Sequence, residues 1–200
     1  MINSLKELEM RVQSIHGFSR PKLRLEQYVT PAKLIASIVW LSFIRGELGR
    51  VVDIGCGPGG FAIASSLLGS RSICIDVDLD AVGDCVDNSM GLDVDAAVMD
   101  ALLPAIRDGF NATCFTNPPF GIWSRRGIDV EMVKSSMSFC GIIYSIHKSS
   151  AAAAVIKKTG GTIVDTSTLL IPHVYSHHRR IKYSVEVVVI RSTKPKDQDA

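Results

Sequence analysis

The segment 53–61, Asp-Ile-Gly-Cys-Gly-Pro-Gly-Gly-Phe, has the composition of a ligand-binding loop. It follows a short β-rich run and precedes a helical stretch, which is the context that gives a glycine-rich loop its meaning. Glycines let the backbone turn sharply and let a ligand approach the peptide plane closely. By itself this loop would serve either a dinucleotide or only a tight turn.

Acidic residues at the ends of neighbouring predicted strands narrow the choice of ligand. Asp76 ends the second strand, where a carboxylate can accept both hydroxyl groups of a ribose, and Asp100 follows the third strand, within reach of an adenine amine. Asp53 ends the first strand and would repel a pyrophosphate but attract a cationic methionine group. The pattern therefore favours S-adenosylmethionine over NAD. The simpler alternative is that Asp76, Asp78 and Asp80 only cap the following helix.

The second motif, Asn117-Pro118-Pro119-Phe120, directly follows the fourth predicted strand. A residue before proline is restricted to extended conformations, so this segment should be stiff. An exocyclic nucleobase amine is a poor nucleophile because its lone pair is delocalised into the ring. The Asn117 side-chain oxygen and the Pro118 carbonyl would accept its two N–H groups, orient the lone pair and stabilise the developing positive charge. Phe120 would stack on a flipped base. Taken alone, the motif is also a turn signal.

The elements that must position these residues alternate between strands and helices. The pattern predicts strands over 51–54, 72–77, 94–98, 113–116, 139–146, 162–170 and 183–190. Helices are predicted over 5–15, 31–48, 61–68, 80–89, 102–107, 129–138 and 149–158. Thr30 should cap the second helix, and Ser149 and Ser150 the last one. The alternation indicates an α/β fold with a doubly wound, mostly parallel, Rossmann-like sheet of seven strands, whose last strand is antiparallel.

Length and composition predict one domain. The chain has 200 residues, 46% of them hydrophobic, and a net charge of +2, which excludes intrinsic disorder as its dominant state. We expect a helical segment over 1–48, a Rossmann-like core over 49–192 and a polar tail over 193–200. The longest apolar run, from Ile35 to Ile44, is well short of the roughly 20 residues that cross a bilayer.

The remaining composition predicts a cytoplasmic protein with reduced cysteines. Charged side chains at Lys6, Glu7 and Glu9 interrupt any apolar core that a signal peptide would need. The cysteines form no C-x-x-C pair, so we expect neither a disulfide framework nor a metal site. They are Cys56, Cys74, Cys85, Cys114 and Cys140.

Together, the glycine loop, the acidic second strand and the Asn-Pro-Pro-Phe motif resemble the class I S-adenosylmethionine-dependent methyltransferases that modify exocyclic amines. Three segments are more discriminating: 25–31 (LEQYVTP), 117–121 (NPPFG) and 144–150 (YSIHKSS). They resemble the methyltransferase-like protein 5 family, and in particular its archaeal members. The resemblance runs from about residue 17 to residue 191 and implies N6-methylation of an adenosine in small-subunit ribosomal RNA.

The resemblance also assigns roles to residues by position. It implies that Gln27 and Thr30 close over the methionine end of the cofactor, that Asp76 holds its ribose and that Asp100 holds its adenine. The target amine would be bound by Asn117 and the three residues that follow it, Pro118, Pro119 and Phe120. The cofactor loop would be formed by Asp53, Gly55, Cys56, Gly57, Pro58 and Gly60.

RNA contacts cannot be argued from a net charge of +2 and would have to come from local basic clusters. Two segments qualify, 20–24 and 177–182, together with the pair at 147–148. Solvated loops are the alternative interpretation of each cluster. The candidate residues for contacts to RNA are Lys22, Arg24, His147, Lys148, Tyr175, His178, Arg179 and Arg180.

A protein partner is a further expectation. If the strand order is the usual one for this class, the strand Val94–Val98 lies at the edge of the sheet. Asp93 and Asp95 would then either discourage edge pairing or flank a docking strand. The family resemblance implies a small zinc-binding activator protein that pairs at this edge.

Three other functions fit the same motifs. A guanine N2 RNA methyltransferase can share Phe120, and a protein glutamine N5-methyltransferase faces the same problem of an amine or amide with two hydrogens, although those enzymes usually have Tyr at that position. A protein that binds the cofactor and RNA without catalysis, as an aid to ribosome assembly, is the alternative outside enzymes.

Overall fold

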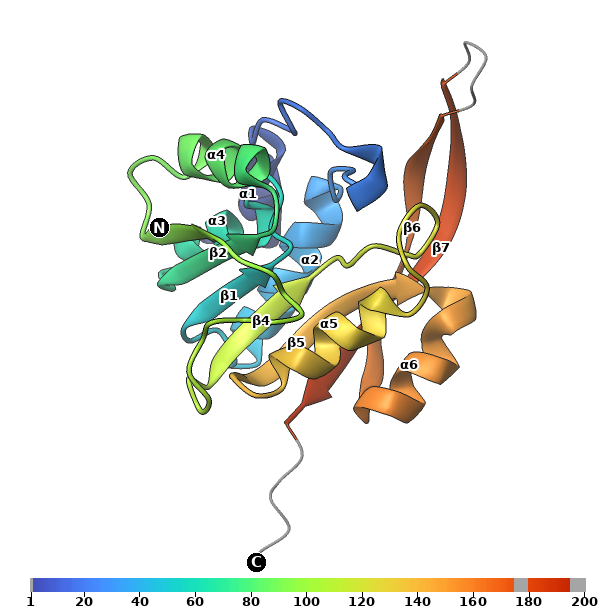
Figure 1. The fold of residues 1–200 in the computed structure, drawn as a ribbon. Coiled ribbons are helices and arrows are strands. Elements are labelled where there is room, and N and C mark those ends of the chain that lie inside the picture. Colours follow the sequence, from blue (N-terminus) through green and yellow to red (C-terminus); the bar gives the residue numbers. More distant parts are fainter. Residues whose placement is uncertain (1, 175–179, 195–200) are drawn as a thin grey trace, which may run out of the picture.

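The computed structural model describes residues 2–174 and 180–194, with a seven-stranded sheet at the centre (Figure 1). Its strands are β1 (Val51–Ile54), β2 (Ser72–Asp76), β3 (Val94–Val98), β4 (Ala112–Thr116), β5 (Cys140–Lys148), β6 (Thr162–Val174) and β7 (Arg180–Thr193). The strand order is β3-β2-β1-β4-β5-β7-β6. Strands β1 to β5 pair in parallel, whereas β7 runs antiparallel to both β5 and β6. This confirms the predicted α/β doubly wound sheet with an antiparallel last strand.

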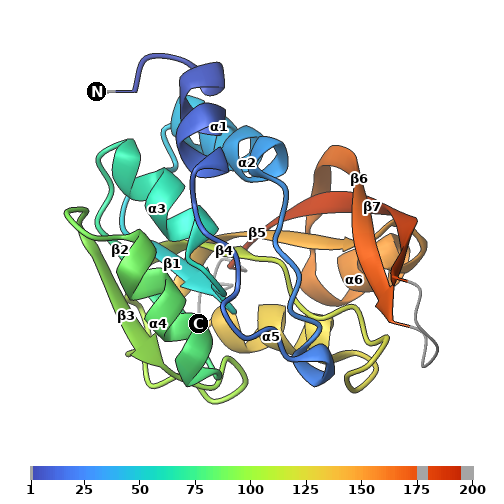
Figure 2. The same cartoon turned by 90° about the horizontal axis from the view of Figure 1, so that it is seen from above.

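Helices cover both faces of the sheet (Figures 1 and 2), which explains why all of β1 is buried. Along β1, Val51 packs in the cluster of the first face, and Val52 and Ile54 pack in the cluster of the second. The first face carries α1 (Leu5–Gln13), α2 (Ala32–Ile44), α3 (Gly60–Leu67) and α4 (Leu79–Asn88). The second face carries α5 (Ile128–Ser136) and α6 (Ala152–Thr159).

A row of aromatic rings fills the centre of the first face. The ring of Phe61 on α3 stacks on Phe115 of β4 at 5.4 Å between centroids, and Phe115 stacks on Tyr144 of β5 at 5.5 Å. Such pairs contribute about 1 kcal/mol each beyond the burial of their area. Among the described residues, no helix is both long and apolar enough to cross a membrane, since the apolar α2 has only 13 residues.

Three local predictions are wrong. The segment 102–107 is irregular after a turn at Leu102 and does not form a helix, because the Asp100 carboxylate accepts the N–H of Leu102 and Pro104 keeps the residue before it out of the helical conformation. Thr30 does not cap α2, whose N-cap is Pro31 without a side-chain hydrogen bond. The serines at 149 and 150 belong instead to a short 3-10 helix, η2 (Ser149–Ala151), which precedes α6 and leaves that helix without a side-chain cap.

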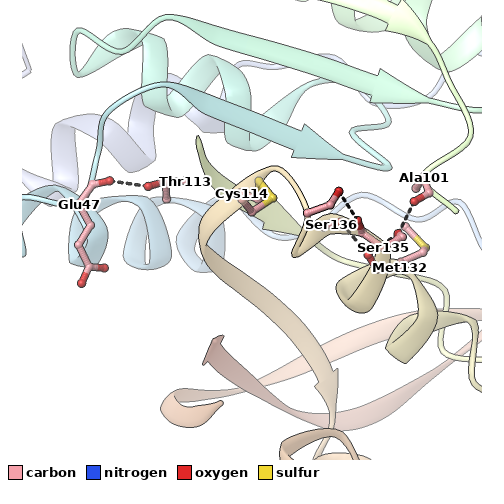
Figure 3. The surroundings of a disulfide bond; sticks show 9 residues. Glu47, Ala101, Thr113, Cys114, Met132, Ser135 and Ser136 are labelled. Carbon is pink, nitrogen blue, oxygen red and sulfur yellow. Dashed lines mark hydrogen bonds between the residues drawn. A yellow bond between two sulfur atoms is a disulfide. The ribbon is translucent and has the colours of Figure 1, made fainter. Parts of the chain in front are cut away.

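The expectation that all five cysteines stay reduced is also wrong, because Cys114 and Cys140 form a disulfide (Figure 3). The two residues are 26 positions apart in the chain, and their Cα atoms lie 5.9 Å apart on the neighbouring strands β4 and β5. Parallel pairing brings together residues that a crossover connection separates, so the sequence spacing gives no sign of this contact. Figure 3 also shows the Ser135 hydroxyl of α5 donating to the Ala101 carbonyl, which ties that helix to the loop after β3.

Glu47 joins several elements at the amino ends of the parallel strands. Its carboxylate accepts Nη2–H of Arg191 on β7 at 2.7 Å and the hydroxyl of Tyr144 on β5. Its backbone carbonyl accepts the hydroxyl of Thr113 on β4 (Figure 3). Burial acts to raise the pKa of Glu47, but Arg191 and Tyr144 outweigh it, so the pKa lies below its ordinary value. The ionised carboxylate therefore stabilises the fold.

Replacing Glu47 by Gln should lower the free energy of unfolding at neutral pH by about 2 kcal/mol, because Arg191 loses its charged partner in a partly buried place. Because the folded pKa is lowered, this stabilisation is fully present above the ordinary pKa of 4.5 and is lost as the pH falls through the folded value. Denaturant unfolding of both proteins at several pH values measures the difference. A difference that does not shrink in that acidic range would contradict the assignment.

Candidate active site

A cavity of about 610 Å³ opens where β1, β2, β3 and β4 end. Its lining comes from the ends of these strands and the loops after them, from the chain segment between α1 and α2, and from residues of α1, α2, α3 and α5. Asn117 and Pro119 contribute to the wall, whereas Pro118 and Phe120 lie beside it. Every residue expected to bind a cofactor lines this one cavity: Gln27, Thr30, Asp53, Gly55, Cys56, Gly57, Pro58, Gly60, Asp76 and Asp100.

Two buried carboxylates hold the glycine loop between β1 and α3. Asp53 accepts the backbone N–H groups of Phe61 at 3.1 Å and Ala62 at 3.0 Å, in the first turn of α3. Asp76 accepts the N–H of Gly57 at 2.9 Å, and Gly57 has a φ of 51°, a conformation that glycine adopts without strain. Burial raises the pKa of Asp53 and also that of Asp76. The loop is thus shaped by the protein's own acidic groups.

The helix-capping alternative holds for Asp78 and not for Asp76, the last residue of β2. Asp78 is the N-cap of α4, and its carboxylate accepts the N–H of Asp80 at 3.2 Å. Asp76 instead binds the glycine loop and the N–H of Asp78. Its carboxylate therefore belongs to the cavity.

The segment between α1 and α2, residues 16–31, is called the strap here. It contains the 3-10 helix η1 (Leu23–Leu25) and crosses the end of the sheet (Figure 2). The Lys22 ammonium pairs with Asp78 and, at 2.8 Å, with Asp80. The Gln27 amide donates to Asp78 at 2.8 Å. These bonds hold the strap over the cavity, and they occupy the charge of Lys22 that was expected to meet RNA.

Glu26 of the strap binds the loop that follows β4. Its carboxylate accepts the backbone N–H groups of Phe120 at 2.7 Å, Trp123 at 2.8 Å and Ser124 at 2.9 Å, and the Ser124 hydroxyl at 2.7 Å. The residue is only 8% exposed. The sequence pattern does not single it out as a site residue, because one acidic side chain between Leu25 and Gln27 carries no sign of burial by itself.

Asn117 contributes to the cavity wall, and its side chain carries a buried acceptor. Its Nδ2–H donates to the Thr30 hydroxyl at 3.0 Å, which fixes the orientation of the amide. Its Oδ1 atom is buried and has no hydrogen-bond partner among the residues that the structure describes. A buried acceptor without a donor is costly, so this atom is suited to an N–H group from outside the chain.

Aromatic rings and one cation lie beside Asn117. The rings of Tyr28 and Phe120 are 5.9 Å apart between centroids, and the Lys148 ammonium lies 5.8 Å from the centre of the Phe120 ring. Trp123 is 46% exposed in the same loop. Flat apolar rings next to a cation are suited to a base and its phosphate.

The residues expected to contact RNA differ in how exposed they are in the structure. His147 is fully buried, with Nδ1 3.0 Å from the Asp129 carboxylate and Nε2 2.9 Å from the Ser145 hydroxyl, so the expectation that it contacts phosphate is wrong. Arg24 is exposed on η1, and Lys148 is half-buried beside Phe120. Arg180 begins β7. Tyr175, His178 and Arg179 lie outside the described residues.

Three free cysteines lie together beneath the glycine loop. The sulfur atoms of Cys56, Cys74 and Cys85 are buried within 4.8 Å of one another. They come from the loop, from β2 and from α4, which is why their spacing in the sequence did not predict the contact. They pack with Ala62 as a small apolar cluster that supports the loop from below.

Comparisons with known proteins extend over nearly the whole chain, although no protein-family profile matches it. It is 31% identical to the rRNA N(6)-adenosine-methyltransferase Mettl5 of Drosophila melanogaster, with 92% of this chain and 93% of the relative covered. It is also 31% identical to the uncharacterized protein MJ0284 of Methanocaldococcus jannaschii, with 94% of each covered. The crystal structure of PH1948 from Pyrococcus horikoshii superposes with a TM-score of 0.83 at 28% identity, covering 97% of this chain and 99% of that one. The chain therefore belongs to the methyltransferase-like protein 5 family of rRNA N6-adenosine methyltransferases, and it has the class I S-adenosylmethionine-dependent methyltransferase fold.

Proposed function

We propose that the protein transfers a methyl group from S-adenosylmethionine to N6 of an adenosine in small-subunit ribosomal RNA. The observation that carries this proposal is the buried Oδ1 atom of Asn117, which lies at the cavity wall without a partner among the described residues. Thr30 holds the amide so that this oxygen is the atom left for a substrate amine. The family supports the choice of substrate, because the Drosophila relative is an rRNA N(6)-adenosine-methyltransferase.

The cavity fits S-adenosylmethionine in size and in the chemistry of its lining. A volume of about 610 Å³ is within the usual range for small-molecule sites. Asp76 would hold the ribose hydroxyls and Asp100 the adenine amine, while Gln27 and Thr30 would lie at the methionine end. When bound, the cofactor supplies an electrophilic methyl group.

The chain's own residues would prepare the target nitrogen. The Asn117 Oδ1 atom and the Pro118 carbonyl would each accept one N–H of the amine, which turns the lone pair toward the methyl group. As the nitrogen becomes positively charged, both acceptors would stabilise it, and the extra proton would then pass to water. Phe120 would stack on the adenine once it is flipped from its neighbours.

Incubation of the protein with small-subunit rRNA and labelled S-adenosylmethionine, followed by nucleoside analysis, tests the proposal. Label in N6-methyladenosine is the expected result. Label in N2-methylguanosine, or in glutamine of a protein, would instead identify one of the two enzymatic alternatives. RNA binding without any transfer would identify the non-catalytic alternative.

Replacing Asn117 by Ala should lower the rate of transfer about 100-fold to 1,000-fold, as expected when one acceptor that acts in the transition state is lost. Binding of S-adenosylmethionine, measured by calorimetry, should remain close to that of the wild type. A variant that transfers methyl groups as fast as the wild type would show that Asn117 has no part in the mechanism. Loss of cofactor binding would show that the residue acts on the cofactor instead.

Lys148 is proposed to contact an RNA phosphate beside the target base. Replacing it by Gln should weaken RNA binding and reduce the slope of log affinity against log salt by about 1. Lys134 on α5 is the matched control, because it is an exposed lysine in the last turn of that helix. An equal change in slope for both variants would show that only total charge matters.

The activator site is proposed at β3, which is one of the two edge strands of the sheet. Val98 is 53% exposed there, which supports contact with a partner. Arg71 lies 3.8 Å from Asp93 and 3.2 Å from Asp95, so the two carboxylates are partly neutralised and leave the edge open to a docking strand. A small zinc-binding protein is the partner that the family resemblance implies.

A further inference from the structure

Glu26 satisfies four hydrogen-bond donors of one short loop. Its Oε2 atom accepts the N–H of Phe120, and its Oε1 atom accepts from Trp123 N–H and from both donors of Ser124. The bonds reach from the strap to residues 94 to 98 positions later in the chain. One side chain thus replaces the regular backbone pairing that this loop lacks after β4 ends.

Because these hydrogen bonds occupy both of its carboxylate oxygens, Glu26 is not placed to act as an acid or a base. Burial acts to raise its pKa, but the Ser124 hydroxyl and the three backbone N–H groups outweigh burial, so the pKa lies below the ordinary value of 4.5. The group is an ionised acceptor at neutral pH, and both of its oxygens already bind donors. It is therefore built to hold the loop and not to take a proton from a substrate.

The backbone at Glu26 shows that the side chain is needed in this place. Its φ is 53° and its ψ is 38°, a left-handed conformation that is strained for a residue with a side chain. Glycine would adopt it freely. The strain is offset by the four bonds that the carboxylate makes, which only an acidic side chain at this point could supply.

The bonded loop is the one that would bind the target base. Phe120 directly follows Asn117-Pro118-Pro119, and its N–H donates to Oε2. The same strap carries Thr30, which orients the Asn117 amide, and Gln27, which lines the cofactor cavity. Glu26 is thus the link between the cofactor side and the base side of the site.

We propose that Glu26 is a positioning residue for methyl transfer, whose carboxylate sets the place of Phe120 and the following loop relative to Asn117. The inference rests on the proposed function, because the loop must receive a base for its place to matter. Without the carboxylate, Phe120 would shift, and the base stacked on it would move slightly away from the acceptor atoms of Asn117 and Pro118. A displacement of about 1 Å can lower a rate 100-fold.

The test compares Glu26→Gln with Glu131→Gln. In the first variant an amide NH₂ must face a backbone N–H, and the bond to Phe120 is the one most easily lost. Glu131 is a matched control because it pairs with Arg125 at the exposed end of the same loop and does not contact Phe120. We expect Glu26→Gln to lower kcat about 100-fold with unchanged S-adenosylmethionine affinity, and Glu131→Gln to leave kcat unchanged.

A second variant and an optical measurement separate positioning from stability. Glu26→Gly relieves the left-handed strain but removes the carboxylate, so it should lose as much activity as Glu26→Gln even if it unfolds at a higher temperature. The protein has two tryptophans, so Trp40→Phe leaves Trp123 as the sole indole to report on the loop. Its emission should change in Glu26→Gln and not in Glu131→Gln.

The outcomes distinguish the two proposals. An active wild type together with a Glu26→Gln variant as fast as Glu131→Gln overturns the positioning role alone. Full activity of Glu26→Gly also overturns it, because backbone shape would then suffice. A wild type that transfers no methyl group to RNA overturns the proposed function, and the positioning role with it.

Discussion

Buried carboxylates that bind backbone N–H groups hold the loops of the candidate site. Asp53 binds the first turn of α3, Asp76 binds the glycine loop, and Glu26 binds the loop after β4. Each group would be costly to bury if its donors were missing, and each loop would lack partners if its carboxylate were missing. The three carboxylates and the backbone N–H groups that they bind therefore hold one another in place. The cavity between these loops keeps its shape because all three sets of hydrogen bonds are made.

The amino ends of the parallel strands carry stabilising contacts, whereas their carboxyl ends carry the candidate site. At the amino ends, Glu47 binds Arg191 and Tyr144 and joins β5 to β7. At the carboxyl ends, the buried Asn117 oxygen has no hydrogen-bond partner among the residues that the structure describes. Stability is thus concentrated away from the place where a substrate would enter. A scaffold fixed at one end can keep unsatisfied groups at the other.

The sequence alone predicts the elements better than their contacts. Strand β1 begins and ends where periodicity and the glycine loop predict, since local signals define it. The role of Glu26 and the cluster of Cys56, Cys74 and Cys85 depend on residues far apart in the chain, which periodicity cannot relate. His147 illustrates the converse, because a histidine beside a lysine suggests a surface cluster, yet it is buried against Asp129. Burial of a polar residue is set by neighbours that only the fold supplies.

The strap also determines the order in which the molecule can assemble. Its bonds to the loop after β4 span more than 90 residues, and the pairing of β4 with β1 helps to bring these distant segments together. Closing so long a loop costs chain entropy before any bond compensates it. Long-range contacts of this kind are expected late in folding, after the sheet has brought the strap and this loop together.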